Sequence, residues 1–157
     1  NNNGKYCLIE FPMLELPYYV NQVLFSLAVK GITPVIAHPE RYVVVGNDPN
    51  IVREWIDNGY LLQMNAGSLI GMFGEKVKKT SEIMLQHQMV HLIASDAHSA
   101  NRRSFILDRA AAEAKKFVSQ EIIHNLVQTN PSQVVTGEPV KIPEPLVYKR
   151  KKRFWFF

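Results

Sequence analysis

The sequence contains one cysteine, Cys7, and this scarcity excludes an internal disulfide framework. A chain with so few thiols fits a reducing cytoplasm. The sequence also lacks any run of about eighteen apolar residues, so hydropathy predicts no membrane-spanning helix. The start, NNNGKYCLIEF, has neither an initiating methionine nor the layout of a signal peptide, and we expect the chain to be cut from a longer one.

An excess of charge of one sign is confined to the C-terminal end. The net charge is +4, and the basic run Lys149–Arg153, followed by the aromatic run 154–157, holds much of it. Because the remainder is nearly balanced, we expect no nucleic-acid-binding surface. Basic and aromatic residues together are typical of a membrane-surface anchor, whereas a solvated charge run is an equal alternative. We expect a cytoplasmic protein, with contact between this tail and the inner membrane surface left open.

The chain has a regular alternation of apolar runs and helical patterns. With 46% hydrophobic residues, 157 residues are enough for one domain with a real core. The alternation predicts an α/β fold with a parallel sheet. One helix is delimited by Asp48 as N-cap, Pro49 at its first position and Gly59 at its end, and a later helix is expected to be capped by Ser119. The expected strands are 5–11, 32–37, 60–66 and 89–95, and the expected helices are 16–31, 47–59, 75–88, 104–119, 121–130 and 130–137.

Each of the expected strands delivers a polar side chain at its end. In a β/α barrel all strands point the same way, so such residues gather at the edge that carries the catalytic site. A closed barrel of this kind takes about 250 residues, and four βα units make about half of one. We therefore expect residues 1–137 to be a partial barrel, and 138–157 to be a Pro-rich linker with the basic-aromatic tail. The polar residues at the strand ends are Glu10, His38, Asn65, Asp96 and His98.

The chemistry of these side chains is that of a metal site. Imidazole and carboxylate without thiolate suit manganese, iron or zinc. Asp96 and His98 are two residues apart, and in an extended chain they would face the same side, in contact with one metal ion or with two neighbouring ions. This pair alone is a weak motif, but Glu10 and His38 on neighbouring strand ends make it more specific.

Four motifs, in this order, resemble one protein family. LIEFP, IAHPERY, NAGSLIG and ASDAHS, with Arg103 five residues after the last histidine, are similar to the bacterial manganese-dependent protein-tyrosine phosphatases of the PHP (polymerase and histidinol phosphatase) superfamily. These enzymes are encoded with capsular and exopolysaccharide genes. The resemblance covers nearly the whole chain.

The resemblance implies a distorted (β/α)7 barrel, of which this chain is the C-terminal part, and a cluster of up to three metal ions. It also implies hydrolysis of phosphotyrosine on a cognate bacterial tyrosine kinase that controls polysaccharide assembly. By position, Arg41 and Arg103 resemble the family's phosphate-binding arginines. The family's metal ligands are matched by Glu10, His38, Asp96 and His98.

The family pattern also has an N-terminal part that this sequence does not contain. The family opens with a His-X-His strand and supplies a further acid and histidine before the LIEFP strand, and none of those residues is present. We therefore expect the 157-residue chain by itself to hold about half of the site, to bind manganese weakly and to be nearly inactive.

Other interpretations stay open at this point. The function could be that of another PHP phosphoesterase, such as a histidinol-phosphate phosphatase, or that of a non-catalytic docking module. His38 could be an ordinary loop histidine, Asp96 a helix cap, and the two arginines rim salt bridges. Glu40 is expected to hydrogen-bond or pair with the site rather than to bind metal. Asn65 either makes a structural hydrogen bond or lines the site.

Cys7 and three further histidines are expected to be structural. A cysteine phosphatase needs a thiolate in a loop of backbone N–H groups beside an arginine. Cys7 instead lies early in an apolar strand with no Gly-rich loop after it, which indicates a core residue. His87 and His124 fall in expected helices, and His91 falls in the middle of an expected strand.

Overall fold

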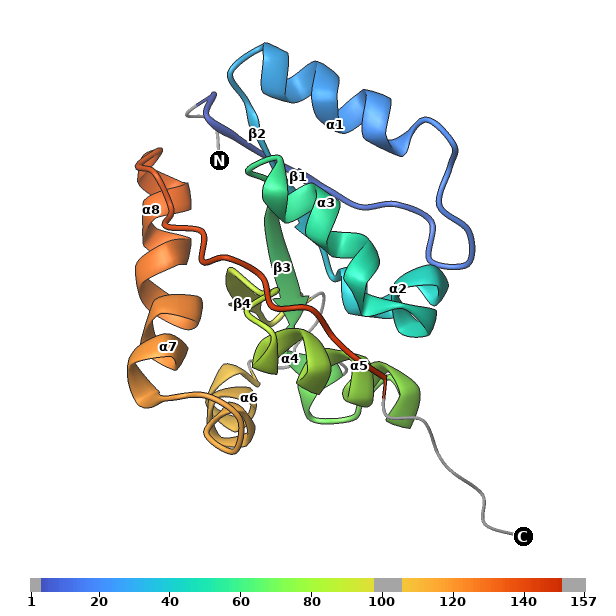
Figure 1. The fold of residues 1–157 in the computed structure, drawn as a ribbon. Coiled ribbons are helices and arrows are strands. Elements are labelled where there is room, and N and C mark those ends of the chain that lie inside the picture. Colours follow the sequence, from blue (N-terminus) through green and yellow to red (C-terminus); the bar gives the residue numbers. More distant parts are fainter. Residues whose placement is uncertain (1–3, 98–105, 151–157) are drawn as a thin grey trace, which may run out of the picture.

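A four-stranded parallel sheet forms the centre of the molecule, with the strands in the order β1-β2-β3-β4 (Figure 1). The computed structural model describes residues 4–97 and 106–150. Every neighbouring pair of strands is parallel, which confirms the expected α/β class. The strands are β1 (Tyr6–Ile9), β2 (Thr33–Ala37), β3 (Leu61–Asn65) and β4 (Leu92–Ala94).

Helices connect the strands and continue after the last one. The short helices α2 and α4 were not expected, and α7, η3 and α8 run on from one another where two separate helices were expected. The α-helices are α1 (Val20–Val29), α2 (Val43–Asn47), α3 (Val52–Asp57), α4 (Ala66–Leu69), α5 (Glu75–Gln86), α6 (Leu107–Ala114), α7 (Gln120–His124) and α8 (Asn130–Thr136). The shorter turns are η1 (Pro39–Arg41) and η2 (Pro49–Ile51), and η3 (Asn125–Thr129) is a π-helical segment.

Helix caps read from the sequence lie where they were expected. The Asp48 carboxylate accepts a hydrogen bond from the Asn50 backbone N–H at 3.0 Å, although the turn it begins is η2, which leads into α3. The Ser119 hydroxyl accepts from the Ile122 N–H at 3.4 Å at the start of α7. Gly59 follows α3 with φ of 83°, a backbone conformation that glycine adopts without strain. These local signals therefore set the helix boundaries.

Two histidines lie outside the elements in which they were expected. His87 follows α5, which ends at Gln86, and His91 precedes β4, which begins at Leu92. The expected strand 89–95 was too long because the Met89 N–H still bonds the Met84 carbonyl, which keeps this part of the chain in the turn that leaves α5. The placement of His91 in mid-strand was therefore wrong.

The two faces of the sheet have different covers. One face packs into the main core with α1, α3, α5 and the later helices, and Ile36, Leu62 and Ile93 are almost fully buried there. The other face carries a smaller cluster around Val35 and Leu61. Its cover comes from α8 and from the C-terminal arm, residues 138–150. The residues of this cluster and its cover are Val35, Leu61, Leu92, Tyr6, Val134, Val140 and Ile142.

The C-terminal arm has no helix or strand, as the Pro-rich sequence predicts, yet it is fastened along its length. The Tyr6 hydroxyl donates to the Glu138 carbonyl at 2.6 Å, and the Leu146 N–H donates to a backbone carbonyl at the end of α5. The Asn50 side chain bonds both the N–H and the carbonyl of Tyr148, at 2.9 and 3.0 Å. The arm therefore crosses the molecule from α8 toward α5 (Figure 1). In the described part of the chain, no helix has the length and hydropathy needed to cross a bilayer.

His91 is a fully buried titratable group beside β4. Its Nδ1 accepts a hydrogen bond from the Leu62 N–H at 3.0 Å, so the neutral ring carries its proton on Nε2. Among the described residues, Nε2 has no hydrogen-bond partner. Burial lowers the pKa of His91 to about 4. Lys141 is the charged residue that lines the cavity beside the ring.

The buried imidazole predicts a specific loss of stability in acid. Between pH 6.5 and about 4 the unfolded chain binds a proton at His91 that the folded chain does not, so stability falls as pH falls. At about 1.4 kcal/mol per pH unit, this residue should cost roughly 2 kcal/mol between pH 7 and pH 5. In His91→Asn, which keeps an acceptor for Leu62, that part of the acid loss should disappear from urea unfolding curves.

The exposed His124 offers a matched control for this measurement. His124→Asn should keep the full loss of stability between pH 7 and pH 5. Equal losses in wild type and His91→Asn would mean that the folded state protonates His91 as readily as the unfolded chain does.

Candidate metal and phosphate site

The parallel register brings the predicted site residues to one edge of the sheet. Ile9 pairs with Ile36, and Ala37 pairs with Gln63, so the strands end nearly in step. Parallel strands that end in step deliver the residues that follow them to the same edge. The residues delivered there are Glu10, His38, Asn65 and Asp96.

Glu10 and His38 form the closest pair of candidate metal ligands. Glu10 Oε1 lies 3.3 Å from His38 Nε2, and the side chain of Glu10 is 59% exposed whereas that of His38 is 4% exposed. His38 has φ of 34°, a left-handed conformation that turns the chain from β2 into η1. Burial lowers the pKa of His38, while the Glu10 carboxylate acts in the opposite direction. A buried imidazole beside an exposed carboxylate is a pair of donors suited to a divalent cation.

The Tyr42 hydroxyl ties together the backbone on both sides of this pair. It donates to the Ala37 carbonyl at 2.9 Å and accepts from the Phe11 N–H at 3.0 Å. These peptide groups directly precede His38 and follow Glu10. Burial raises the pKa of Tyr42 to about 12, so the hydroxyl keeps its proton and its role as donor at neutral pH.

Glu40 lies between His38 and Arg41 in the sequence but points into the protein, with 1% of its surface exposed. Its Oε1 accepts two hydrogen bonds, from the Asn65 N–H at 3.0 Å and from the Ser68 hydroxyl at 2.6 Å. The expected hydrogen-bonding role of Glu40 is thus confirmed. Burial raises the pKa of this carboxyl to about 7, although both hydrogen bonds oppose the rise.

Asn65 makes the structural hydrogen bond that was one of the two roles left open by the sequence. Its Oδ1 accepts from the Gly67 N–H at 2.9 Å and caps α4. Its Nδ2 donates to Asp96 Oδ2 at 2.8 Å, so the same side chain contacts a predicted metal ligand. One amide therefore connects the end of β3 to the segment that follows β4.

Asp96 does not have the extended conformation that was expected. β4 ends at Ala94, and Asp96 has φ of 50°, so the argument that placed Asp96 and His98 on one side of an extended chain fails at Asp96. Nor does Asp96 cap α6, which Ile106 precedes. His98 and Arg103 lie outside the described residues. Within residues 4–97 and 106–150, no three His, Cys, Asp or Glu side chains come together as a metal-binding cluster.

Arg41 ends η1 and is oriented by an aromatic ring. Its guanidinium carbon lies 4.2 Å from the centre of the Phe73 ring, a favourable cation–π geometry. In the part of the chain that the structure describes, no salt bridge includes Arg41, which does not support its interpretation as a rim ion pair. A guanidinium oriented in this way still offers its N–H fork to an anion.

Cys7 lies within β1, as expected, but it is half-buried and belongs to neither core cluster of the described residues, so its interpretation as a core residue was wrong. Its thiol is 3.9 Å from the Leu8 carbonyl. Tyr42 and Ser68 were not among the residues expected at the site. Both lie inside the quoted motifs, but the Tyr42–Phe11 and Ser68–Glu40 hydrogen bonds join residues 31 and 28 positions apart, which local patterns do not show.

The fold and the sequence agree with one family. The chain belongs to the capsular polysaccharide synthesis CpsB/CapC family, whose profile matches residues 1–136.

Relatives and a solved structure share most of this chain. CapC from Staphylococcus aureus is 38% identical over 99% of this chain and 60% of its own length. The tyrosine-protein phosphatase YwqE from Bacillus subtilis is 34% identical over 99% of this chain and 61% of its length. A solved structure superposes with a TM-score of 0.88 at 33% identity, over 95% of this chain and 60% of that chain. It is one of the structures of YwqE from Bacillus subtilis and CpsB from Streptococcus pneumoniae, which are unique metal-dependent tyrosine phosphatases. The chain thus spans about 60% of the length of these curated relatives.

The two hydrogen bonds of the Tyr42 hydroxyl, which join the ends of β1 and β2, are expected to contribute measurably to stability. Tyr42→Phe leaves the buried Phe11 N–H and Ala37 carbonyl without their side-chain partner. The free energy of unfolding, measured in urea, should fall by about 1–3 kcal/mol.

Tyr60 provides the control for this substitution. It is also a buried tyrosine, but its hydroxyl makes no hydrogen bond to another described residue. Tyr60→Phe should change the free energy of unfolding by no more than about 0.5 kcal/mol. If the two variants lost equal stability, the hydroxyl bridge would not hold the two strand ends.

Proposed function

We propose that the protein that contains this chain is a metal-dependent protein-tyrosine phosphatase. Its substrate would be phosphotyrosine on a cognate bacterial tyrosine kinase that regulates capsular or extracellular polysaccharide synthesis, in the cytoplasm. The observation that carries the proposal is the gathering of Glu10, His38 and the Asn65–Asp96 pair at one sheet edge, with Arg41 beside it. The phosphatase relatives support the reaction class.

The sheet is proposed to be the C-terminal part of a distorted (β/α)7 PHP-type barrel, formed by residues 1–137. Four parallel strands in sequential order, each followed by helix, support this proposal. The side chain of Leu8 in β1 supports it as well, because an apolar residue that is 65% exposed within a strand is what an incompletely covered barrel wall would present. Residues 138–157 are the linker and tail of this proposed arrangement.

The side chains at the sheet edge fit a hard or borderline divalent metal ion. Carboxylate and imidazole without thiolate suit manganese, with iron or zinc as alternatives. The buried His38 has an Nδ1 atom with no hydrogen-bond partner among the described residues, as a site built around a further group would have. Glu10, His38, Asp96 and His98 would hold the metal, in a cluster of up to three ions. Bound metal ions would lower the pKa of water and offset negative charge on the phosphate.

The arginines are assigned to the phosphoryl group. Arg41 is steered by Phe73 and offers a planar fork that matches phosphate oxygens, and Arg103 takes the same role by its position in the family motif. Tyrosinate is a fairly good leaving group, so the proposal requires no strong general acid. Cys7 has no part in the reaction.

The function is tested on the complete protein with a phosphotyrosine peptide and manganese. Chelator should abolish hydrolysis and added manganese should restore it. Arg41→Ala should lower kcat/KM roughly a hundredfold, because it removes a charged donor from oxygens that gain charge in the transition state. Arg41→Lys should recover part of this loss, since it keeps the charge without the fork. Arg103→Ala should behave as Arg41→Ala does.

Cys7→Ser serves as the matched control and should leave kcat within a few-fold of wild type. An inactive Cys7→Ser variant with normal fold and metal content would mean that the thiol is the nucleophile. Faster turnover of histidinol phosphate than of the phosphotyrosine peptide would favour another PHP phosphoesterase. Absence of manganese from the purified complete protein would favour a docking module.

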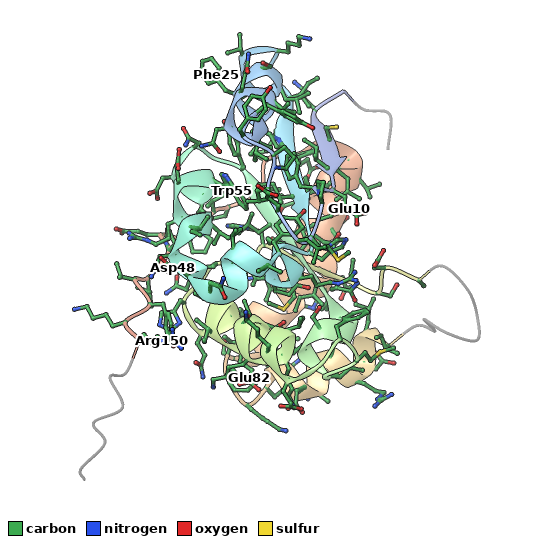
Figure 2. All side chains as sticks on the ribbon, turned by 90° about the vertical axis from the view of Figure 1, so that its right-hand side faces the viewer. Glu10, Phe25, Asp48, Trp55, Glu82 and Arg150 are labelled. Atoms are coloured by element: carbon green, nitrogen blue, oxygen red, sulfur yellow. The ribbon has the colours of Figure 1, made fainter. Side chains whose placement is uncertain are left out.

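The basic-aromatic tail is proposed to contact the inner membrane surface. In Figure 2, Arg150 and Glu10 lie on opposite sides of the view, so the described end of the arm lies away from the proposed site. Each basic residue near an anionic membrane surface contributes about 1 kcal/mol to the free energy of membrane binding.

Deletion of residues 149–157 should weaken binding to anionic phospholipid vesicles and leave hydrolysis of a soluble phosphopeptide unchanged. The arm itself should stay in place, because its last anchor is Tyr148 on Asn50. Co-sedimentation with vesicles of anionic and of neutral composition measures the effect. Equal binding by the full and the shortened protein would assign the tail to a solvated charge run.

A further inference from the structure

A chain of hydrogen bonds joins three strand ends behind the proposed site. The Asn65 backbone N–H donates to Glu40 Oε1 at 3.0 Å, and the Asn65 side chain donates to Asp96 Oδ2 at 2.8 Å. Glu40 follows β2, Asn65 ends β3 and Asp96 follows β4. A single residue, Asn65, is therefore held on its main chain by one carboxylate and holds a second carboxylate through its side chain.

The first carboxylate in this chain has little freedom to move. Glu40 is 1% exposed, and the Ser68 hydroxyl bonds the same oxygen, Oε1, at 2.6 Å. Ser68 lies in α4, the helix that Asn65 caps through its contact with the Gly67 N–H. Glu40 thus fixes both the residue that caps α4 and a residue within α4. The carboxylate therefore holds the main chain from which the Asn65 side chain extends to Asp96.

The second carboxylate, that of Asp96, is held by the Asn65 amide. Asp96 stands past the end of β4 with φ of 50°, a left-handed conformation that is uncommon for non-glycine residues. The amide that holds Oδ2 also sets the direction of Oδ1 and hence the geometry that the carboxylate offers to a metal ion. Mutation of a group that orients a metal ligand from behind typically weakens metal affinity by about 10- to 100-fold.

We propose that Glu40 and Asn65 are positioning residues, which orient the Asp96 carboxylate for metal binding through the hydrogen bonds Glu40–Asn65 and Asn65–Asp96. This inference rests on the proposed function, because it takes Asp96 as a metal ligand. It adds two residues that do not contact metal or substrate. The hydrogen bonds, rather than the charge of Glu40, carry the effect.

The test measures the dissociation constant of manganese on the complete protein, together with the melting temperature. Asn65→Ser keeps a capping oxygen for α4 and removes the donor to Asp96. Glu40→Leu removes the acceptor of Asn65 and Ser68, whereas Glu40→Gln keeps an acceptor oxygen in nearly the same place. Asn65→Ser and Glu40→Leu should weaken manganese binding about tenfold or more. Glu40→Gln should stay within about threefold of wild type.

Asn130→Ala is the control for simple loss of a partly buried hydrogen bond. The Asn130 amide donates to the His91 carbonyl at 2.7 Å, before the start of β4, while Asp96 follows its end. This variant should melt earlier and keep the manganese affinity of wild type. If Glu40→Leu does not fold, the comparison of Asn65→Ser with Glu40→Gln gives the answer, since both retain the hydrogen bonds of α4.

Three results would overturn the proposal. In the first, Asn65→Ser melts earlier but binds manganese as wild type does, which leaves only a structural role. In the second, Glu40→Gln loses as much affinity as Glu40→Leu, which assigns the effect to charge or to direct ligation. In the third, wild type binds no manganese. A different result separates the two proposals. If the variants show the expected manganese affinities but the wild-type protein does not hydrolyse phosphotyrosine, the proposed function is refuted and the positioning roles are upheld.

Discussion

Parallel hydrogen bonding in step along β1 to β4 is the constraint on which the site depends. Each strand contributes one or two polar residues at its end, and these residues meet only because the strands end at the same level. A slip of one residue would turn the terminal side chain of a strand to the opposite face of the sheet. The short distance between Glu10 and His38 is therefore a consequence of the register between β1 and β2, since nothing in their local sequences brings them together.

Buried hydrogen bonds convert this coarse alignment into a defined geometry. The hydroxyl of Tyr42 and the carboxylate of Glu40 lie within the protein, and each bonds two groups from different segments. Burial of polar groups is costly unless they are satisfied, so these residues stabilise the fold only in the arrangement that satisfies them. The loops after the strands thereby acquire the rigidity that a ligand-binding edge needs.

Local patterns in the sequence correctly predicted the strands, their parallel order and the polar residues at the strand ends. They did not predict α2 and α4, because helices of five and four residues are too short to show a helical period. The left-handed backbone at His38 and Asp96 was also unpredictable, since contacts distant in sequence maintain it at non-glycine residues. For the same reason the hydrogen bonds of Asn65 to Asp96 and of Ser68 to Glu40 became visible only in the folded chain.

The C-terminal arm has a consequence for the order in which the protein forms. Its contacts join residues very distant in sequence, with separations of 132 positions between Tyr6 and Glu138 and 98 between Asn50 and Tyr148. Contacts of such long range form late in folding. During synthesis, the ribosome completes all four strands before it makes the arm. Val35, Leu61 and Leu92 therefore lack part of their apolar cover until the arm emerges, and the nascent domain has one sheet face incompletely shielded during that interval.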